Sequence, residues 1–218
     1  MDLIVFDLDG TLIDSRLDLA HAVNATRLQM GMPPLDNDRV YSYVGNGAQV
    51  LIRRALGDRA TEAEVAAALE YFLQYYGAHK LDYTILYPGV REALDRLLAA
   101  GKKMAVLTNK PVRISRAIVE GLGTGPHFFQ VYGGNSFDFK KPHPIGIQAL
   151  MRETAIGADR TLMVGDSSVD VETARNAGVK VCGVTYGFQP ESLEDPAPDW
   201  KVDRMEELAD RLLGAPDR

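Results

Sequence analysis

Two aspartates stand two residues apart where the first apolar run of the chain ends, in "LIVFDLDGTLIDS". Asp7 and Asp9 follow a segment with the composition of a buried strand, and Gly10 and Thr11 come directly after them. Carboxylates this close repel each other unless a cation lies between them. The segment therefore predicts a site in which two acids act together with a positive charge.

Other polar residues stand at comparable positions further along the chain. Several follow apolar runs that we expect to be strands, and one precedes an expected helix: Thr108 and Asn109, Asp166 and Asp170, and Lys141. Ligands of open parallel sheets bind beyond the carboxyl ends of the strands. We therefore expect these side chains to gather with the two acids at one edge of a sheet.

The elements that must position these residues alternate along the chain. Apolar runs without strict alternation, typical of strands covered on both faces, predict strands at 3–6, 102–108, 161–165 and 179–185. Helical periodicity with proline at the start or glycine at the end predicts helices at 88–100, 111–121, after Pro144, at 168–178 and at 205–213. Residues 187–200 are expected to form a loop. Strands alternating with helices predict an α/β fold with a parallel, doubly wound sheet.

One long interval interrupts this alternation. From Ser15 to about Lys80 the sequence has only helical patterns, including a capping box formed by Thr61 and Glu64. This is far more chain than one crossover helix requires. We expect an all-helical domain inserted at residues 16–83, with a discontinuous core domain formed by residues 1–15 and 84–218.

The combined charges predict a metal site and a phosphate site. Four carboxylates at one edge, those of Asp7, Asp9, Asp166 and Asp170, need a cation, and ligands that are all oxygen favour Mg²⁺ over zinc. Asp170 also suits the first turn of a helix, where the helix dipole favours an acid. Magnesium in proteins usually keeps several waters and takes one or two carboxylates plus a phosphate oxygen, so it implies a phosphate ligand. Hydroxyl, backbone N–H and ammonium groups nearby would bind that phosphate. Together they predict phosphoryl transfer.

Four segments carry a family resemblance, and they span essentially the whole chain. The motifs "DLDGTLIDS", "LTNK", "KP" and "GDSSVD", in this order and around the helical insertion, resemble the haloacid-dehalogenase-like superfamily, in particular its phosphatases with a helical cap after the first strand. The resemblance implies a Rossmann-like core. It implies that Asp7 is the nucleophile and forms an aspartyl-phosphate, while Asp9 is the general acid and then the base that activates water.

The same resemblance assigns the remaining groups of the core. Mg²⁺ would be held by Asp7, the backbone carbonyl of Asp9 and Asp166. Asp170 would support these ligands without binding the metal directly. The transferring phosphoryl group would be bound by Thr108 and Lys141. The backbone N–H of Asn109 is a further donor suited to phosphate. Lys141 is preferred over Lys140 because the lysine of the family directly precedes proline.

The presence of Asp9 argues against dehalogenation, because a halide leaving group needs no proton. The segments "YVGNGAQVLIRRAL" and "GVTYGF" look like the phosphoglycolate phosphatase group, which implies 2-phosphoglycolate as substrate. In the cap, Gly45, Asn46 and Gly47 would offer N–H groups to its carboxylate, and Arg53 or Arg54 would offer charge. Alternatives are a nucleotide or pyrophosphate phosphatase, a sugar-phosphate mutase and, less in keeping with the insertion, a non-enzymatic phospho-acceptor switch.

Composition limits the partners and the compartment. The 218 residues carry a net charge of −6 without a dense basic cluster, which argues against nucleic acid or an anionic membrane as a partner. The expected partner is a small phosphate ester, and the chain is expected to be a monomer or a homodimer. A single cysteine, Cys182, fits a reducing compartment, and Asp7 interrupts the first apolar run too early for a signal peptide. We expect a cytoplasmic protein.

Overall fold

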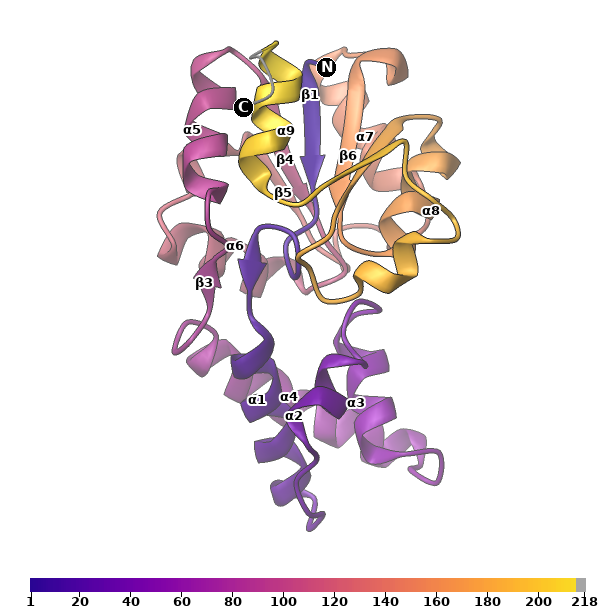
Figure 1. Ribbon diagram of the computed structural model, residues 1–218. Coiled ribbons are helices and arrows are strands. Elements are labelled where there is room, and N and C mark those ends of the chain that lie inside the picture. Colours follow the sequence, from indigo (N-terminus) through magenta and orange to yellow (C-terminus); the bar gives the residue numbers. More distant parts are fainter. Residues whose placement is uncertain (215–218) are drawn as a thin grey trace.

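The computed structural model describes residues 1–214 and has an α/β architecture, as expected (Figure 1). Its main sheet has six strands in the order β5–β4–β1–β6–β7–β8, and every neighbouring pair is parallel. The strands are β1 (Leu3–Phe6), β4 (Lys103–Leu107), β5 (Gln130–Tyr132), β6 (Thr161–Gly165), β7 (Lys180–Val184) and β8 (Trp200–Val202).

Helices cover both faces of this sheet. Because side chains alternate along a strand, Leu3 and Val5 of β1 pack into one apolar cluster, whereas Ile4 and Phe6 pack into the other. Both faces of β1 are therefore buried, which explains its uninterrupted apolar sequence. The first cluster includes residues of α7 (Ile145–Thr154) and α8 (Ser168–Ala177), and the second includes residues of α5 (Val90–Ala99), α6 (Val112–Gly121) and α9 (Met205–Leu213).

The four predicted strands and the predicted helices are confirmed, but two strands of the main sheet were not predicted. Strands β5 and β8 each contain only three residues and occupy the two edges of the sheet. Short edge strands carry too few residues for a periodic signal. The expected loop at 187–200 is wrong in detail, because Pro190–Leu193 form a 3₁₀ helix and Trp200 begins β8.

The long interval after β1 is helical, as its pattern predicted. Its helices, α1 (Arg16–Gln29), α2 (Asn37–Tyr41), α3 (Ala48–Leu56) and α4 (Glu62–His79), lie together beyond the carboxyl ends of the main strands (Figure 1). The predicted capping box begins α4: Thr61 Oγ1 accepts the N–H of Glu64, and the Glu64 carboxylate accepts the N–H of Thr61. None of the helices between residues 1 and 214 is long and apolar enough to cross a membrane.

The chain passes between the sheet and the helical insertion twice, and the two passages are joined. Strands β2 (Ile13–Asp14) and β3 (Ile85–Leu86) form an antiparallel pair. Next to this pair, the buried carboxylate of Asp18 in α1 accepts the N–H of Tyr83, at 3.0 Å, and both the N–H and the hydroxyl of Thr84, at 2.9 and 2.7 Å. The first turn of the insertion is thus bonded to the segment that leaves it.

Candidate active site

The order of the strands brings the predicted residues together. Strand β1 lies between β4 and β6, and the chain builds one side of the sheet before it crosses to the other. Such a switch point forms a crevice at the carboxyl ends of the strands. Asp7, Thr108 and Asp166 each follow one of these three neighbouring strands, so they meet in this crevice although they are far apart in sequence.

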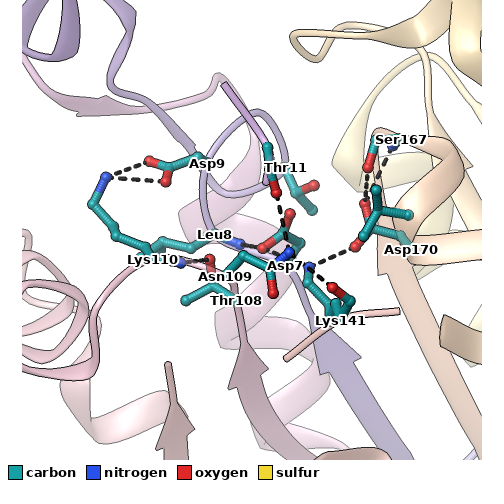
Figure 2. Close-up of polar contacts among 12 residues, drawn as sticks. Asp7, Leu8, Asp9, Thr11, Thr108, Asn109, Lys110, Lys141, Ser167 and Asp170 are labelled. Atoms are coloured by element: carbon teal, nitrogen blue, oxygen red, sulfur yellow. Dashed lines mark hydrogen bonds and ion pairs between the residues drawn. The ribbon is translucent and has the colours of Figure 1, made fainter. Parts of the chain in front are cut away.

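Lys141 connects two of the acids (Figure 2). Its ammonium lies 2.9 Å from Oδ1 of Asp7 and 2.6 Å from Oδ1 of Asp170. The N–H of Leu8 donates to the same Asp7 oxygen at 2.7 Å, and the hydroxyl of Ser167 donates to Asp170 at 2.8 Å. Asp170 is fully buried, and Lys141 and Ser167 each contact one of its carboxylate oxygens.

Burial and mutual repulsion govern the protonation of this cluster. Burial raises the pKa of Asp7 to about 6, with Lys141 opposing the rise and Asp170 adding to it. Burial also raises the pKa of Asp166 to about 8, and the charges of Asp170 and Asp7 add to that effect. For Lys141, burial disfavours the ammonium, but Asp170 and Asp7 outweigh it and raise the pKa. The cluster therefore has more negative charge than one lysine compensates.

This excess of carboxylate fits a divalent metal. Asp7, Asp166 and Asp170 are buried and each offers an oxygen, and these atoms all lie within 4.8 Å of one another. A set of ligands that are all oxygen suits a hard cation. Asp166 is fixed by the N–H of Phe188, at 2.7 Å, and it packs so closely against Gly10 that a Cβ there would overlap its carboxylate.

Asp9 faces away from that cluster and has its own cation. Both of its carboxylate oxygens contact the ammonium of Lys110, at 2.8 and 3.0 Å (Figure 2). The hydroxyl of Ser15 also donates to Asp9, at 2.5 Å. Lys110 lies over the ring of Tyr76 from α4, with its nitrogen 4.6 Å from the ring centre. Although burial opposes the ammonium, Asp9 outweighs it and raises the pKa of Lys110.

Lys110 belongs to the "LTNK" motif, but the sequence alone assigned this site residue no role. A signal was present, because Lys110 is the third polar residue in succession after β4, next to Thr108 and Asn109. Three polar residues directly after a buried strand all belong to the loop at the edge where ligands bind.

Thr108 and Asn109 lie where they were expected, but the side chain of Asn109 makes a further connection. Thr108 lines the cavity, and its hydroxyl accepts the N–H of Lys110 at 3.2 Å. The Asn109 amide donates to two carbonyls, that of Lys141 at 3.2 Å and that of Gly45 in the helical insertion at 3.1 Å. Asn109 therefore links the edge of the sheet to the helical insertion.

The contact to Gly45 is one of three on a short segment, which we call the cap loop (residues 44–47). Its first three carbonyls, those of Val44, Gly45 and Asn46, each accept a hydrogen bond from a side chain of a different loop at the sheet edge. The donors are, in order, Gln189 (2.6 Å), Asn109 (3.1 Å) and Lys140 (2.6 Å). The cap loop is therefore held against the sheet edge through its backbone.

A cavity of about 50 Å³ lies between the cap loop and the acids. Gly45 and Gly47 line it, whereas Asn46 and Arg54 line a neighbouring hollow, where Arg54 donates to the carbonyl of Tyr43 at 3.2 Å. The helical insertion also contributes apolar side chains to this cavity, namely Leu19, Val44, Ala48, Leu51, Phe72 and Tyr76. Of the expected cap residues, the structure thus brings only the two glycines into the cavity with the acids.

The chain is similar to known proteins over most of its length. Residues 4–184 match the haloacid dehalogenase-like hydrolase family, and the chain belongs to that family. It is 41% identical over 213 residues to the phosphoglycolate phosphatase of Pseudomonas fluorescens (strain Pf0-1), covering 94% of this chain and 78% of the relative. It is also 41% identical over 213 residues to the phosphoglycolate phosphatase of Vibrio parahaemolyticus, covering 94% of this chain and 93% of that protein.

Solved structures are also similar to this chain over nearly its whole length. A crystal structure from Haemophilus somnus, described as a predicted phosphoglycolate phosphatase, has a TM-score of 0.91 and 35% identity, covering 99% of this chain and 98% of that one. CbbY from Rhodobacter sphaeroides, solved in complex with phosphate, has a TM-score of 0.78 and 25% identity, covering 95% and 96% of the two chains. The recognition of the family from its four motifs is therefore confirmed.

Proposed function

We propose that this protein is a magnesium-dependent phosphatase that hydrolyses a small phosphate monoester, 2-phosphoglycolate, through an aspartyl-phosphate. One observation carries the proposal: the Asp7 carboxylate stands at the end of the central strand, paired with Lys141, in a small cavity that Thr108 and Asp166 also line. The names of the relatives supply the particular ester, and the size of the cavity favours a compact one.

Asp7 is the nucleophile in this proposal. Its Oδ1 accepts hydrogen bonds from Leu8 and Lys141, and these fix the orientation of the carboxylate. The other oxygen, Oδ2, attacks phosphorus, and the ester oxygen leaves with the bond's electron pair. Water then cleaves the aspartyl-phosphate, which releases inorganic phosphate and restores the carboxylate.

Lys141, Thr108 and the N–H of Asn109 bind the phosphoryl group while it is transferred. Lys141 is buried between two acids and keeps its proton, so it supplies a permanent positive charge beside the reacting carboxylate. The Thr108 hydroxyl lies at the end of the adjacent strand and can donate to a phosphoryl oxygen. Such donors stabilise charge that develops in the transition state.

Asp9 handles the proton of the leaving group. It donates a proton to the ester oxygen as the bond to phosphorus breaks, and it then removes a proton from the water that attacks the aspartyl-phosphate. The contacts with Lys110 and Ser15 keep its carboxylate apart from the cluster around Asp166. The two acids of the first motif thus have separate surroundings and separate tasks.

Asp7 and Asp166 would hold Mg²⁺, together with the backbone carbonyl of Asp9, and Asp170 would support them through Lys141. The geometry that supports this assignment is the buried set of carboxylate oxygens within 4.8 Å of one another. When bound, the metal neutralises charge on the phosphoryl group.

The proposal includes a division of labour along the chain. Residues 1–15 and 84–218, of which 215–218 lie outside the described part, form the catalytic core, and residues 16–83 form a cap that closes over the substrate. The apolar cap side chains in the cavity support this division, since they exclude water from the aspartyl-phosphate. A cytoplasmic location is also proposed, in keeping with the free, buried Cys182.

A panel of phosphate esters tests the proposal. With Mg²⁺, kcat/KM should be highest for 2-phosphoglycolate, compared with para-nitrophenyl phosphate, a nucleoside monophosphate, pyrophosphate and glucose 6-phosphate. Excess chelator should abolish phosphate release, and added Mg²⁺ should restore it. Undiminished turnover in chelator would remove the metal from the mechanism. A nucleotide, pyrophosphate or hexose phosphate as the preferred substrate would replace 2-phosphoglycolate, and phosphate transfer between sugar positions would indicate a mutase.

A further inference from the structure

The cavity around the acids contains very little positive charge. Among the described side chains that line it, Lys110 is the only lysine or arginine, whereas Asp7, Asp9 and Asp166 all line the same space. Arg54, the cation expected from the cap, lines the neighbouring hollow, and Arg53 pairs with Glu62. A negative group on a substrate, beyond the phosphoryl group itself, therefore has one cationic side chain to meet in this cavity.

Lys110 is held in a fixed position from two sides. Asp9 contacts its ammonium through both oxygens, at 2.8 and 3.0 Å, and the Tyr76 ring of α4 lies against it with 4.6 Å between nitrogen and ring centre. Only 6% of Lys110 is exposed. An ammonium has three N–H donors, and the two oxygens of Asp9 occupy at most two of them. At least one donor is therefore free of Asp9.

The chemistry of the ester places a carboxylate near that donor. In 2-phosphoglycolate the leaving oxygen is bonded to a CH₂ group, and that same carbon carries the carboxylate. Asp9 is the residue that serves the leaving oxygen in the proposed mechanism. A cation within 3.0 Å of Asp9 is therefore within reach of a carboxylate one carbon away from that oxygen.

We infer that Lys110 determines specificity for acidic two-carbon esters by binding the carboxylate next to the leaving oxygen. This inference rests on the proposed function. It moves recognition of the carboxylate from the cap to the core, to the loop that also carries Thr108 and Asn109. The cap contributes the ring of Tyr76, which keeps the ammonium in place.

Two substrates that differ only at the carboxylate test the inference. 2-Hydroxyethyl phosphate has the same chain length as 2-phosphoglycolate, with a neutral hydroxymethyl group in place of the carboxylate. Steady-state kinetics with both substrates should be measured for the wild-type protein, Lys110→Met, Lys110→Arg and a matched control, Lys103→Met. Lys103 is exposed at the opposite end of β4. Thermal unfolding of each variant checks that it is folded.

The wild-type and Lys103→Met proteins should prefer 2-phosphoglycolate. In Lys110→Met, kcat/KM for 2-phosphoglycolate should fall about 10- to 100-fold more than that for 2-hydroxyethyl phosphate, as expected for a lost charge-assisted hydrogen bond. The additional loss should lie mainly in KM, and Lys110→Arg should recover part of it. If both substrates lose the same factor in Lys110→Met, Lys110 acts only on Asp9 and the inference is overturned. If the wild-type protein hydrolyses neither substrate, the proposed function itself fails.

Discussion

The core side and the cap side of the cavity consist of different kinds of chemical group. The core side is made of charged side chains that contact one another, such as Lys141 between Asp7 and Asp170. The cap side presents glycine backbone and apolar side chains such as Leu51 and Phe72, and it is held in place by hydrogen bonds to its carbonyl groups. In the proposed mechanism, the core therefore supplies the chemistry, and the cap supplies shape and the exclusion of water.

This contrast has an energetic side. A buried charge that loses its partner costs several kcal/mol, whereas a single lost neutral hydrogen bond costs about 0.5–1.5 kcal/mol. Changes in the core should therefore have large, coupled effects on stability and catalysis. Changes in the cap loop should have small effects that concern substrate binding.

The largest effect is expected for Asp7→Asn. Because an amide is a poor nucleophile, kcat for 2-phosphoglycolate should fall by about 10⁴-fold or more, as for other covalent nucleophiles. The free energy of unfolding should not fall comparably, because the change removes one charge from a crowded acidic cluster. Asp2→Asn is a matched control, because Asp2 directly precedes the first residue of β1, at the end of the strand opposite to Asp7. This variant should keep its activity. Near-normal turnover by Asp7→Asn would rule out Asp7 as the nucleophile.

A large loss of stability is expected for Lys141→Met. The change leaves Asp7 and the fully buried Asp170 without their shared cation, which should cost about 3–5 kcal/mol in urea unfolding in the absence of metal. The double variant Lys141→Met/Asp170→Asn should recover part of this loss, because it removes the stranded charge. If the double variant is as unstable as the sum of the single variants, the two residues are not coupled.

A smaller effect is expected from pH in the absence of metal. The pKa of Asp166 is about 8 and that of Asp7 about 6, both above the ordinary value of 3.8. Between about pH 4 and 8 the folded chain therefore binds more protons than the unfolded chain, so the free energy of unfolding should fall as pH rises.

Urea unfolding at pH 5, 6.5 and 8 in chelator measures this slope. Saturating Mg²⁺ should remove most of it, because the metal replaces the proton, and Asp166→Asn should flatten the profile in chelator. If the free energy of unfolding in chelator rises with pH across this range, the pKa values of Asp166 and Asp7 are not raised in the folded chain.

The smallest effects are expected at the donors to the cap loop. Gln189→Leu or Lys140→Met removes one hydrogen bond to a backbone carbonyl and should raise KM for 2-phosphoglycolate about 2- to 10-fold, with kcat within about twofold. Lys201→Met, which removes an exposed ion pair with Glu194, is a matched control and should behave like the wild-type protein. A 100-fold loss of kcat in Gln189→Leu would show that the cap loop takes part in the chemistry.

The sequence predicted the core far better than the cap. Asp7, Thr108 and Asp166 each follow a strongly apolar strand, so parallel topology alone places them together. In the cap loop, by contrast, the contacts are made by backbone carbonyls, and any residue type has one. The ion pair between Asp9 and Lys110 was not predicted for another reason. Several lysines follow the strands, and sequence alone does not determine which lysine side chain contacts which acid.

The carboxylate of Asp18 has a consequence for how the molecule moves. Because this side chain, in the first turn of α1, bonds the returning chain at Tyr83 and Thr84, the two linkers cannot slide past each other without breaking buried hydrogen bonds. If the helical insertion closes over the site as proposed, its motion would be a swing about one common pivot beside β2 and β3. Each closure would then bring the same atoms of the insertion to the same places at the sheet edge.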